Sequence, residues 1–218
     1  MKPVITIDGP AASGKSSVSR ALAEKLGWNW VSTGIFYRGL AFLAMELKAN
    51  VDDEQSILQL LTRQKWSIEM TREETQFVFN GKVVTDRLNQ EQIGIIASKV
   101  SGFPEVRKAL LQPQRDCLKR SHNGLVAEGR DCGTVVFPTA QIKFYLTAAS
   151  TDRAIRRAKE EGKSVEETKT MQKERDTKDK SREVAPLQVP EGSHVIDTTG
   201  MSLSEVIDKV YGLVKSSL

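Results

Sequence analysis

The stretch VITIDGPAASGKSS, residues 4–17, joins a short apolar run to a helical pattern through a loop that contains two glycines. Residues 9–16 match the spacing G-x-x-x-x-G-K-[ST] and lie between a predicted strand and a predicted helix, as a phosphate-binding loop must. Glycines let successive backbone N–H groups turn toward one anion, and the N-terminus of the helix adds partial positive charge. The stretch therefore predicts a binding site for the phosphates of a nucleotide.

Two side chains of this loop have expected roles. Lys15 should reach the outer phosphates, and the hydroxyl of Ser16 can ligate Mg²⁺. On average composition, a chance match in a chain of this length arises roughly one time in a hundred. The motif by itself leaves open a kinase, a GTPase, a motor and an ATP-gated binding module. The residues expected to contact ATP here are Gly9, Pro10, Ala11, Ala12, Ser13, Gly14, Lys15, Ser16 and Ser17.

Beyond the loop, short β-branched runs alternate with longer helical patterns. This alternation predicts an α/β fold with a five-stranded parallel sheet covered by helices on both faces. The first helix is predicted over residues 15–26, and the last begins with a capping box of Ser202 and Glu205. The predicted strands are VITID (4–8), WNWVS (28–32), GLVAE (124–128), IKFYL (142–146) and HVIDT (194–198).

One interruption of the alternation predicts an antiparallel insert. Residues 53–62 have a helical pattern behind Asp52, and the three short strands WSIEM, QFVF and KVVT follow. Asn80-Gly81 joins the last two of these strands and is a strong two-residue hairpin signal. Further on, Pro113 lies inside a helical pattern and should kink that helix.

The second interruption, residues 151–182, mixes basic and acidic residues without a clear apolar stripe. We expect a solvated, movable helical flap there. Arg153 and Arg157 share one face at i, i+4, as do Arg175 and Asp179. Alone, this pattern is more typical of a solvated surface. In a phosphoryl-transfer enzyme such a flap would place cations around the transferred group and exclude water.

Composition narrows the class of protein. The 218 residues include 32 Lys and Arg against 28 Asp and Glu, a small surplus that demands no nucleic-acid surface. No segment approaches the roughly 18 uninterrupted apolar residues of a membrane span. Cys117 and Cys132 match no metal-binding spacing, so we expect them to be core residues of a reduced chain. These features predict a soluble cytoplasmic protein that binds neither nucleic acid nor membrane. We also expect it to be a monomer that acts on small molecules.

Charged residues follow two of the predicted strands at the edge of the sheet where α/β proteins bind ligands. Tyr37 and Arg38 come soon after the second strand, and Arg130 and Asp131 directly after the third. An arginine at this edge can clamp a phosphate bidentately, and Glu128 can hold a water on Mg²⁺. The alternatives are an arginine on an exposed helix face and a local Arg–Asp pair in a turn.

Four motifs in order, IDGPAASGKSS, STGIFYRGLA, EGRDCGTVVFP and ERDTKDKSREVAPL, resemble the bacterial cytidylate kinase family, which phosphorylates CMP and dCMP. The resemblance covers nearly the whole chain. It implies a P-loop nucleoside-kinase core that binds ATP, an inserted monophosphate-binding lobe with a small antiparallel sheet, and a helical lid. The implied boundaries are residues 1–34, 104–150 and 183–218 for the core, 35–103 for the lobe and 151–182 for the lid.

The resemblance also implies the roles of individual residues. Catalysis would depend on Lys15, Arg130 and Arg182, and Arg157 would lie near ATP. Asp131 would accept a hydrogen bond from the amino group of cytosine, and Ser98 and Arg107 would donate to its ring acceptors. Arg175 and Asp179 would meet the sugar hydroxyls. The full CMP set is Thr33, Tyr37, Arg38, Ser98, Arg107, Arg130, Asp131, Arg175, Asp179 and Arg182.

Some residues depart from the family pattern. Glu128 stands where an aspartate is common, and Lys178 and Lys180 stand where the flap often carries arginine. Because lysine lacks the planar fork of arginine, the number of bidentate phosphate contacts in the flap stays open.

Other functions fit less well. DTTG, residues 197–200, matches D-x-x-G of a GTPase but lies far beyond the loop, and the chain has no NKxD. A nucleic-acid motor would need a larger chain and a basic track. A kinase of a small non-nucleotide metabolite is the nearest alternative but has less use for the insert. We therefore expect Mg²⁺-dependent transfer of the ATP γ-phosphoryl group to CMP or dCMP, in pyrimidine metabolism.

Overall fold

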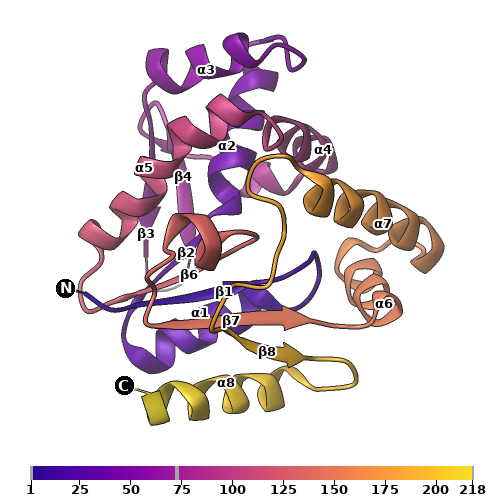
Figure 1. The fold of residues 1–218 in the computed structure, drawn as a ribbon. Coiled ribbons are helices and arrows are strands. Elements are labelled where there is room, and N and C mark those ends of the chain that lie inside the picture. The colour runs from indigo at the N-terminus through magenta and orange to yellow at the C-terminus, as the bar shows by residue number, and fades with distance from the viewer. Residues whose placement is uncertain (1, 72–73, 218) are drawn as a thin grey trace.

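The computed structural model describes residues 2–71 and 74–217, with the backbone alone for residues 160 and 161. Its main sheet is parallel, in the order β2-β6-β1-β7-β8 (Figure 1). This arrangement confirms the predicted five-stranded parallel sheet. The strands are β1 (Val4–Asp8), β2 (Asn29–Ser32), β6 (Leu125–Gly129), β7 (Ile142–Thr147) and β8 (His194–Asp197).

Helices cover both faces of this sheet. The helices α1 (Lys15–Leu26) and α8 (Leu203–Ser217) pack on one face with Ile5 and Ile7 of β1. The helices α2 (Gly34–Glu46) and α5 (Pro104–Arg120) pack on the other face with Val4. Because side chains alternate along a strand, Thr6 and Asp8 point to the same side as Val4. The first predicted helix is thus confirmed.

The insert follows α2. It contains α3 (Glu54–Arg63), β3 (Trp66–Met70), β4 (Thr75–Phe79), β5 (Lys82–Val83), the 3₁₀ helix η1 (Thr85–Asn89) and α4 (Glu91–Val100). Its three strands form the predicted antiparallel sheet. Asn80 and Gly81 have φ of 48° and 74°, both left-handed, as the type I′ hairpin turn requires.

Two details of the predicted insert are wrong. The third strand ends at Val83 rather than at Thr85, because Thr85 begins η1 and its hydroxyl accepts from Phe77 N at 2.9 Å. The helix cap is Asp53, whose carboxylate accepts from two main-chain amides of α3, at 3.1 and 3.2 Å. Asp52 instead forms an ion pair with Lys99 of α4.

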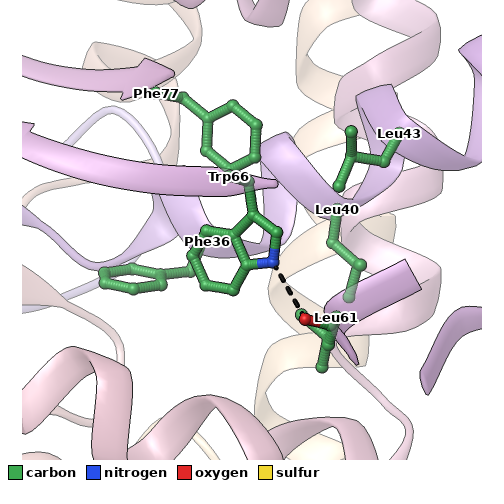
Figure 2. A pocket seen from close by; sticks show the side chains of 6 residues that line it. All are labelled: Phe36, Leu40, Leu43, Leu61, Trp66 and Phe77. Atoms are coloured by element: carbon green, nitrogen blue, oxygen red, sulfur yellow. Dashed lines mark hydrogen bonds between the residues drawn. The ribbon is translucent and has the colours of Figure 1, made fainter. Parts of the chain in front are cut away.

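A small aromatic cluster joins the insert to α2 (Figure 2). The rings of Trp66 and Phe77 stack with centroids 5.8 Å apart, and Trp66 Nε1 donates to Leu61 O at 3.2 Å. Phe36 meets the edge of Trp66. A Cβ built on Gly39 would lie 2.0 Å from the ring of Phe77, so only glycine allows this close approach. The insert is therefore tightly packed on the core.

The predicted flap consists of α6 (Ser150–Glu161) and α7 (Val165–Ser181), at the right of Figure 1. The expected helices are confirmed, and most side chains of α7 are exposed as expected, but the flap also has a buried side that the sequence did not indicate. Arg153, Ala154 and Gln172 are buried, because the two helices pack on each other and Arg153 donates to Ala11 O of the phosphate loop. Small and polar residues make this contact, so it leaves no apolar stripe in the sequence.

Two of the remaining expectations are confirmed, and the kink expected at Pro113 stays a prediction. Glu205 N donates to Ser202 Oγ and Ser202 N to Glu205 Oε2, at 3.3 and 2.7 Å, which confirms the capping box. The helix α5 continues through Pro113. Cys117 and Cys132 are both unpaired and buried. Within the described ranges, no helix has both the length and the apolarity needed to span a membrane.

Candidate functional site

The loop between β1 and α1 has the backbone of a phosphate cradle. Gly9 and Gly14 have φ of 152° and 85°. A Cβ on Gly9 would lie 2.0 Å from Leu146 O, so this position excludes any larger residue. Gly14 has no side chain that could cap the first amides of α1, which leaves them available to an anion.

Lys15 is buried inside this loop, with 6% of its surface exposed. Its Nζ donates to Pro10 O at 2.6 Å. Burial, followed by the nearby cation of Arg130, lowers the pKa of Lys15 to about 7. A phosphate in the loop would favour the charged form, so the geometry suits an anionic ligand.

Next to the loop, Ser16 Oγ donates to Glu128 Oε1 at 2.9 Å. Glu128 is buried near the end of β6, where β6 pairs with β1. Hydroxyl and carboxylate oxygens beside a phosphate site are ligands of the kind that Mg²⁺ prefers. The described residues contain no group of three or more His, Cys, Asp or Glu that could hold a metal without a substrate. The pair therefore fits an ion that arrives with a nucleotide.

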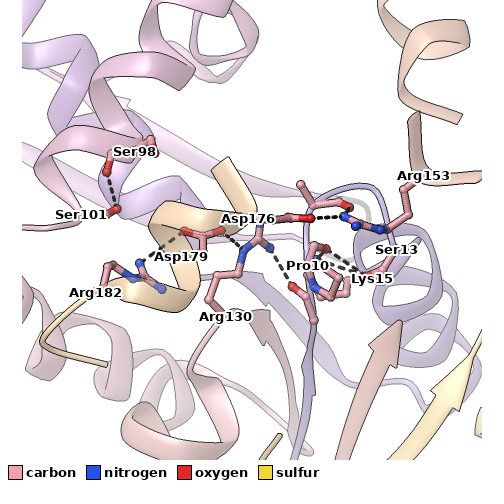
Figure 3. Close-up of polar contacts among 12 residues, drawn as sticks. Pro10, Ser13, Lys15, Ser98, Ser101, Arg130, Arg153, Asp176, Asp179 and Arg182 are labelled. Carbon is pink, nitrogen blue, oxygen red and sulfur yellow. Dashed lines mark hydrogen bonds and ion pairs between the residues drawn. The ribbon is translucent and has the colours of Figure 1, made fainter. Parts of the chain in front are cut away.

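Arg130 connects the phosphate loop to α7, the second helix of the predicted flap (Figure 3). Its Nη1 donates to Gly9 O at 3.0 Å, and its Nε donates to Asp179 Oδ2 at 2.7 Å. Arg182 lies 3.7 Å from the other oxygen of Asp179. Burial opposes ionisation of Asp179, yet the charge and hydrogen bond of Arg130 hold its pKa below its usual range. Three predicted site residues thus meet beside the phosphate loop.

A second connection runs through Arg153 of α6. Its guanidinium donates to Ala11 O at 3.1 Å and pairs with Asp176 of α7 at 2.7 Å (Figure 3). The lid is therefore attached to the loop at two points, each an arginine that bonds both a loop carbonyl and a lid carboxylate.

Two of the three predicted base-recognition residues are in contact. Arg107 and Asp131 form a buried ion pair, and Arg107 Nη1 donates to Ser101 O at 3.0 Å. The guanidinium lies 5.4 Å from the ring centroid of Tyr37. Burial raises the pKa of Tyr37 to about 12, so this hydroxyl stays protonated.

A cavity of about 510 Å³ lies between α4 and α7. Predicted residues Ser98, Asp179 and Arg182 line it, together with Lys178, one of the departures from the family pattern. The cavity is large enough for a nucleotide-sized ligand. The other lining residues are Ile95, Lys99, Gly102 and Ser181.

Other predicted residues have different surroundings. Arg38 Nη1 donates to Leu88 O at 2.6 Å, and the hydroxyl of Thr33 donates to Glu128 O at 2.9 Å. Burial and the neighbouring Arg130 lower the pKa of Arg175 to about 10. Arg157 is half-buried on α6. Arg156, the residue before Arg157 on α6, donates to Thr198 after β8.

The sequence reasoning missed two carboxylates, of which Asp8 is buried and Asp176 half-buried. Asp176 pairs with Arg153, and Asp8 accepts hydrogen bonds from the backbone after Arg130. A carboxylate at the end of an apolar strand, directly before the phosphate loop, was a visible signal for Asp8. The spacing of Asp176 within the charged flap carried no comparable signal.

A phosphate loop after a central strand, a helical flap attached to it by arginines and a cavity between α4 and α7 are typical of a P-loop phosphoryl-transfer enzyme. The gluconokinase from Sinorhizobium meliloti 1021 has this fold, with a TM-score of 0.52, 14% identity and coverage of 99% of this chain and 94% of that chain. The family model for cytidylate kinase matches residues 5–216. The chain belongs to the cytidylate kinase family, which confirms the resemblance, and is a kinase.

Individual relatives agree with the family model. The cytidylate kinase of Bdellovibrio bacteriovorus is 55% identical over 218 residues and covers 100% of both chains. The cytidylate kinase of Aeromonas hydrophila is 40% identical and covers 100% of this chain and 96% of its own.

Proposed function

We propose that this kinase transfers the γ-phosphoryl group of ATP to CMP and dCMP, forming CDP and dCDP for pyrimidine nucleotide metabolism. The position of Arg130 carries the proposal. Its guanidinium contacts the phosphate loop through Gly9 O and the cavity wall through Asp179. A cation that spans two ligand sites can stabilise charge on a group that moves from one to the other.

On the ATP side, the loop amides and Lys15 would hold the phosphates. Ser16, and Glu128 through a water, would hold Mg²⁺ beside them, an arrangement supported by their 2.9 Å contact. When bound, this ion supplies positive charge to the phosphate oxygens. Arg157 of α6 would lie near the ATP.

On the acceptor side, we place the monophosphate between the loop and the cavity. Tyr37, Arg38, Arg130 and Arg182 would surround its phosphate, and Thr33 would border this site. Arg175 and Asp179 would contact the sugar. The contact between Arg130 and Asp179 supports a site where sugar and phosphate groups are recognised side by side.

For the base, we infer that Asp131 accepts from the 4-amino group of cytosine while Arg107 and Ser98 donate to its ring. The buried pair of Arg107 and Asp131 supports this assignment, because a base that satisfies both groups compensates for separating them. Uracil presents an oxygen to Asp131 and would leave the carboxylate without a donor.

We keep the expected division into core (1–34, 104–150 and 183–218), monophosphate-binding lobe (35–103) and lid (151–182). We also propose that the enzyme is a cytoplasmic monomer. The two buried thiols support a reducing compartment. Light scattering should return the mass of one chain.

The decisive experiment is a coupled ADP-release assay with CMP, dCMP, UMP, AMP and GMP as acceptors. We expect kcat/KM for CMP and dCMP to exceed that for the other three by at least about tenfold. Lys15→Ala serves as the control for ATP-dependent turnover. Equal turnover of all five acceptors, or of none, contradicts the proposed substrate.

A second measurement tests the base contact. Asp131→Asn should narrow the preference for CMP over UMP, because an amide can donate to the 4-oxo group of uracil. The ratio of the two kcat/KM values is the readout. An unchanged ratio would remove Asp131 from base recognition.

A further inference from the structure

Asp8, the last residue of β1, is a fully buried carboxylate with no role in the site as described so far. Both of its oxygens accept hydrogen bonds from one short stretch of backbone. Oδ1 accepts from Cys132 N at 2.8 Å, and Oδ2 accepts from Gly133 N at 2.7 Å. These residues lie directly after Arg130 and Asp131.

The two amides begin the short π-helix η2 (Cys132–Val136). The first N–H groups of a helix have no partner within it. The side chain of Asp131, at the N-cap position, makes no capping bond; it pairs with Arg107 instead. Asp8, at the end of β1, therefore caps η2 in place of Asp131. A carboxylate suits this role because its two oxygens can accept from two adjacent amides.

The turn between β6 and η2 is closely packed. A Cβ on Gly133 would lie 2.9 Å from Thr6 Oγ1 and 3.1 Å from Asp8 Oδ2. A Cβ on Gly129 would lie 2.3 Å from Thr33 Oγ1. The glycines on both sides of Arg130 and Asp131 thus leave no space for a side chain, and the turn packs directly against Thr6, Asp8 and Thr33.

Holding a turn with a buried carboxylate costs free energy, because burial disfavours the charged form of the group. Burial raises the pKa of Asp8 to about 7, although the two amides act in the opposite direction. Thr6 lies on the same strand and the same face, and its buried hydroxyl has no hydrogen-bond partner. Thr6 is therefore a polar group on this face of β1 that, within the described part of the chain, is not hydrogen-bonded to the turn.

We propose that Asp8 is a positioning residue for the phosphoryl acceptor. It ties the turn that carries Arg130 and Asp131 to the strand that leads into the phosphate loop. The guanidinium that contacts Gly9 O and the carboxylate that faces Arg107 are thereby held in register with the loop. This inference rests on the roles of Arg130 and Asp131 in the proposed function.

The test is Asp8→Asn, which keeps the size of the side chain but turns a donor toward one of the two amides. We expect KM for CMP to rise about tenfold and the CMP/UMP preference to fall severalfold, with KM for ATP changed less than twofold. Thr6→Val is the matched control, because it removes a polar group from the same strand face without losing a hydrogen bond. It should leave all kinetic constants unchanged.

Gly133→Ala disturbs the same turn from the other side and should reproduce this pattern if Asp8→Asn does not fold. For each variant, the melting temperature and the affinity for ATP establish that the loop is intact. Equal losses for ATP and CMP with an unchanged CMP/UMP ratio would overturn the proposal, as would unchanged kinetics in both variants. A wild-type enzyme without a preference for CMP would instead contradict the proposed function.

Discussion

At the level of single residues, the site is built from ion pairs between arginine guanidinium groups and aspartate carboxylates. Arg130 pairs with Asp179, and Arg153 with Asp176. Each arginine also donates to a carbonyl of the phosphate loop. Because such pairs are largely buried, removal of one member leaves an uncompensated charge. The site is therefore sensitive to single substitutions.

Arg130→Ala should lower kcat/KM for CMP by about 10²- to 10³-fold, through loss of a charge-assisted contact to the transferred group. Steady-state kinetics with a parallel melting curve measures this effect. Arg20→Ala, at an exposed position of α1, is the control for removal of an arginine. Near-normal kcat/KM would assign Arg130 a structural role alone.

The two thiols should be inert in the folded protein. Burial raises the pKa of Cys117 to about 11 and that of Cys132 well above its usual value. At pH 8 only about one Cys117 in a thousand is then a thiolate, the reactive form. Mass spectrometry after iodoacetamide treatment should find both thiols unmodified in the native chain and alkylated in denaturant. Rapid labelling of the native protein would contradict their burial.

Among the helices and strands, α2 depends on a glycine at its contact with the insert. Alanine normally stabilises a helix by up to about 1 kcal/mol relative to glycine. At Gly39 the added Cβ would overlap the ring of Phe77, and overpacking costs about 1–3 kcal/mol. Packing therefore outweighs helix propensity at this position.

Gly39→Ala should thus lower the free energy of unfolding, by up to about 2 kcal/mol as the balance of these two effects. Gly212→Ala in α8 is the matched control, because its Cβ would meet no atom within 4 Å. That variant should stabilise the protein by about 0.5–1 kcal/mol. Urea unfolding measures both changes. Equal shifts of the same sign would show that propensity alone governs both positions.

At the scale of the complete protein, the flap formed by α6 and α7, here called the lid, also contacts the insert. Lys163, between α6 and α7, lies 2.8 Å from Glu91 at the start of α4. In the proposed function, this pair joins the two parts that would separate when a nucleotide leaves the cavity between α4 and α7. Because both side chains are partly exposed, the pair should stabilise the closed arrangement by at most about 1 kcal/mol.

Lys163→Glu should therefore open the lid and raise KM for CMP up to about fivefold at low salt. The double variant Lys163→Glu with Glu91→Lys should restore KM, because it reverses the pair rather than removing it. Kinetics at low and high ionic strength measures the effect. A double variant whose KM for CMP stays as high as that of Lys163→Glu would show that the two residues act independently.

The sequence by itself determined what depends on neighbouring residues. The phosphate loop, the bounds of α1, the Asn80-Gly81 turn and the Ser202–Glu205 capping box all follow from short spacings with one stereochemical solution. The parallel sheet followed from the alternation of strands and helices. Local patterns were also sufficient to assign the family, because its motifs are themselves short.

Only the tertiary structure decided which charged groups meet. Asp8 and Cys132 are 124 residues apart, and Arg130 and Asp179 are 49 apart, so no local pattern could pair them. Even at short range, Asp53 rather than Asp52 capped α3, because Asp52 pairs with Lys99. Burial of the lid residues depended in the same way on packing between helices. Ion pairs and burial depend on distance in space, which a sequence does not contain until the chain is folded.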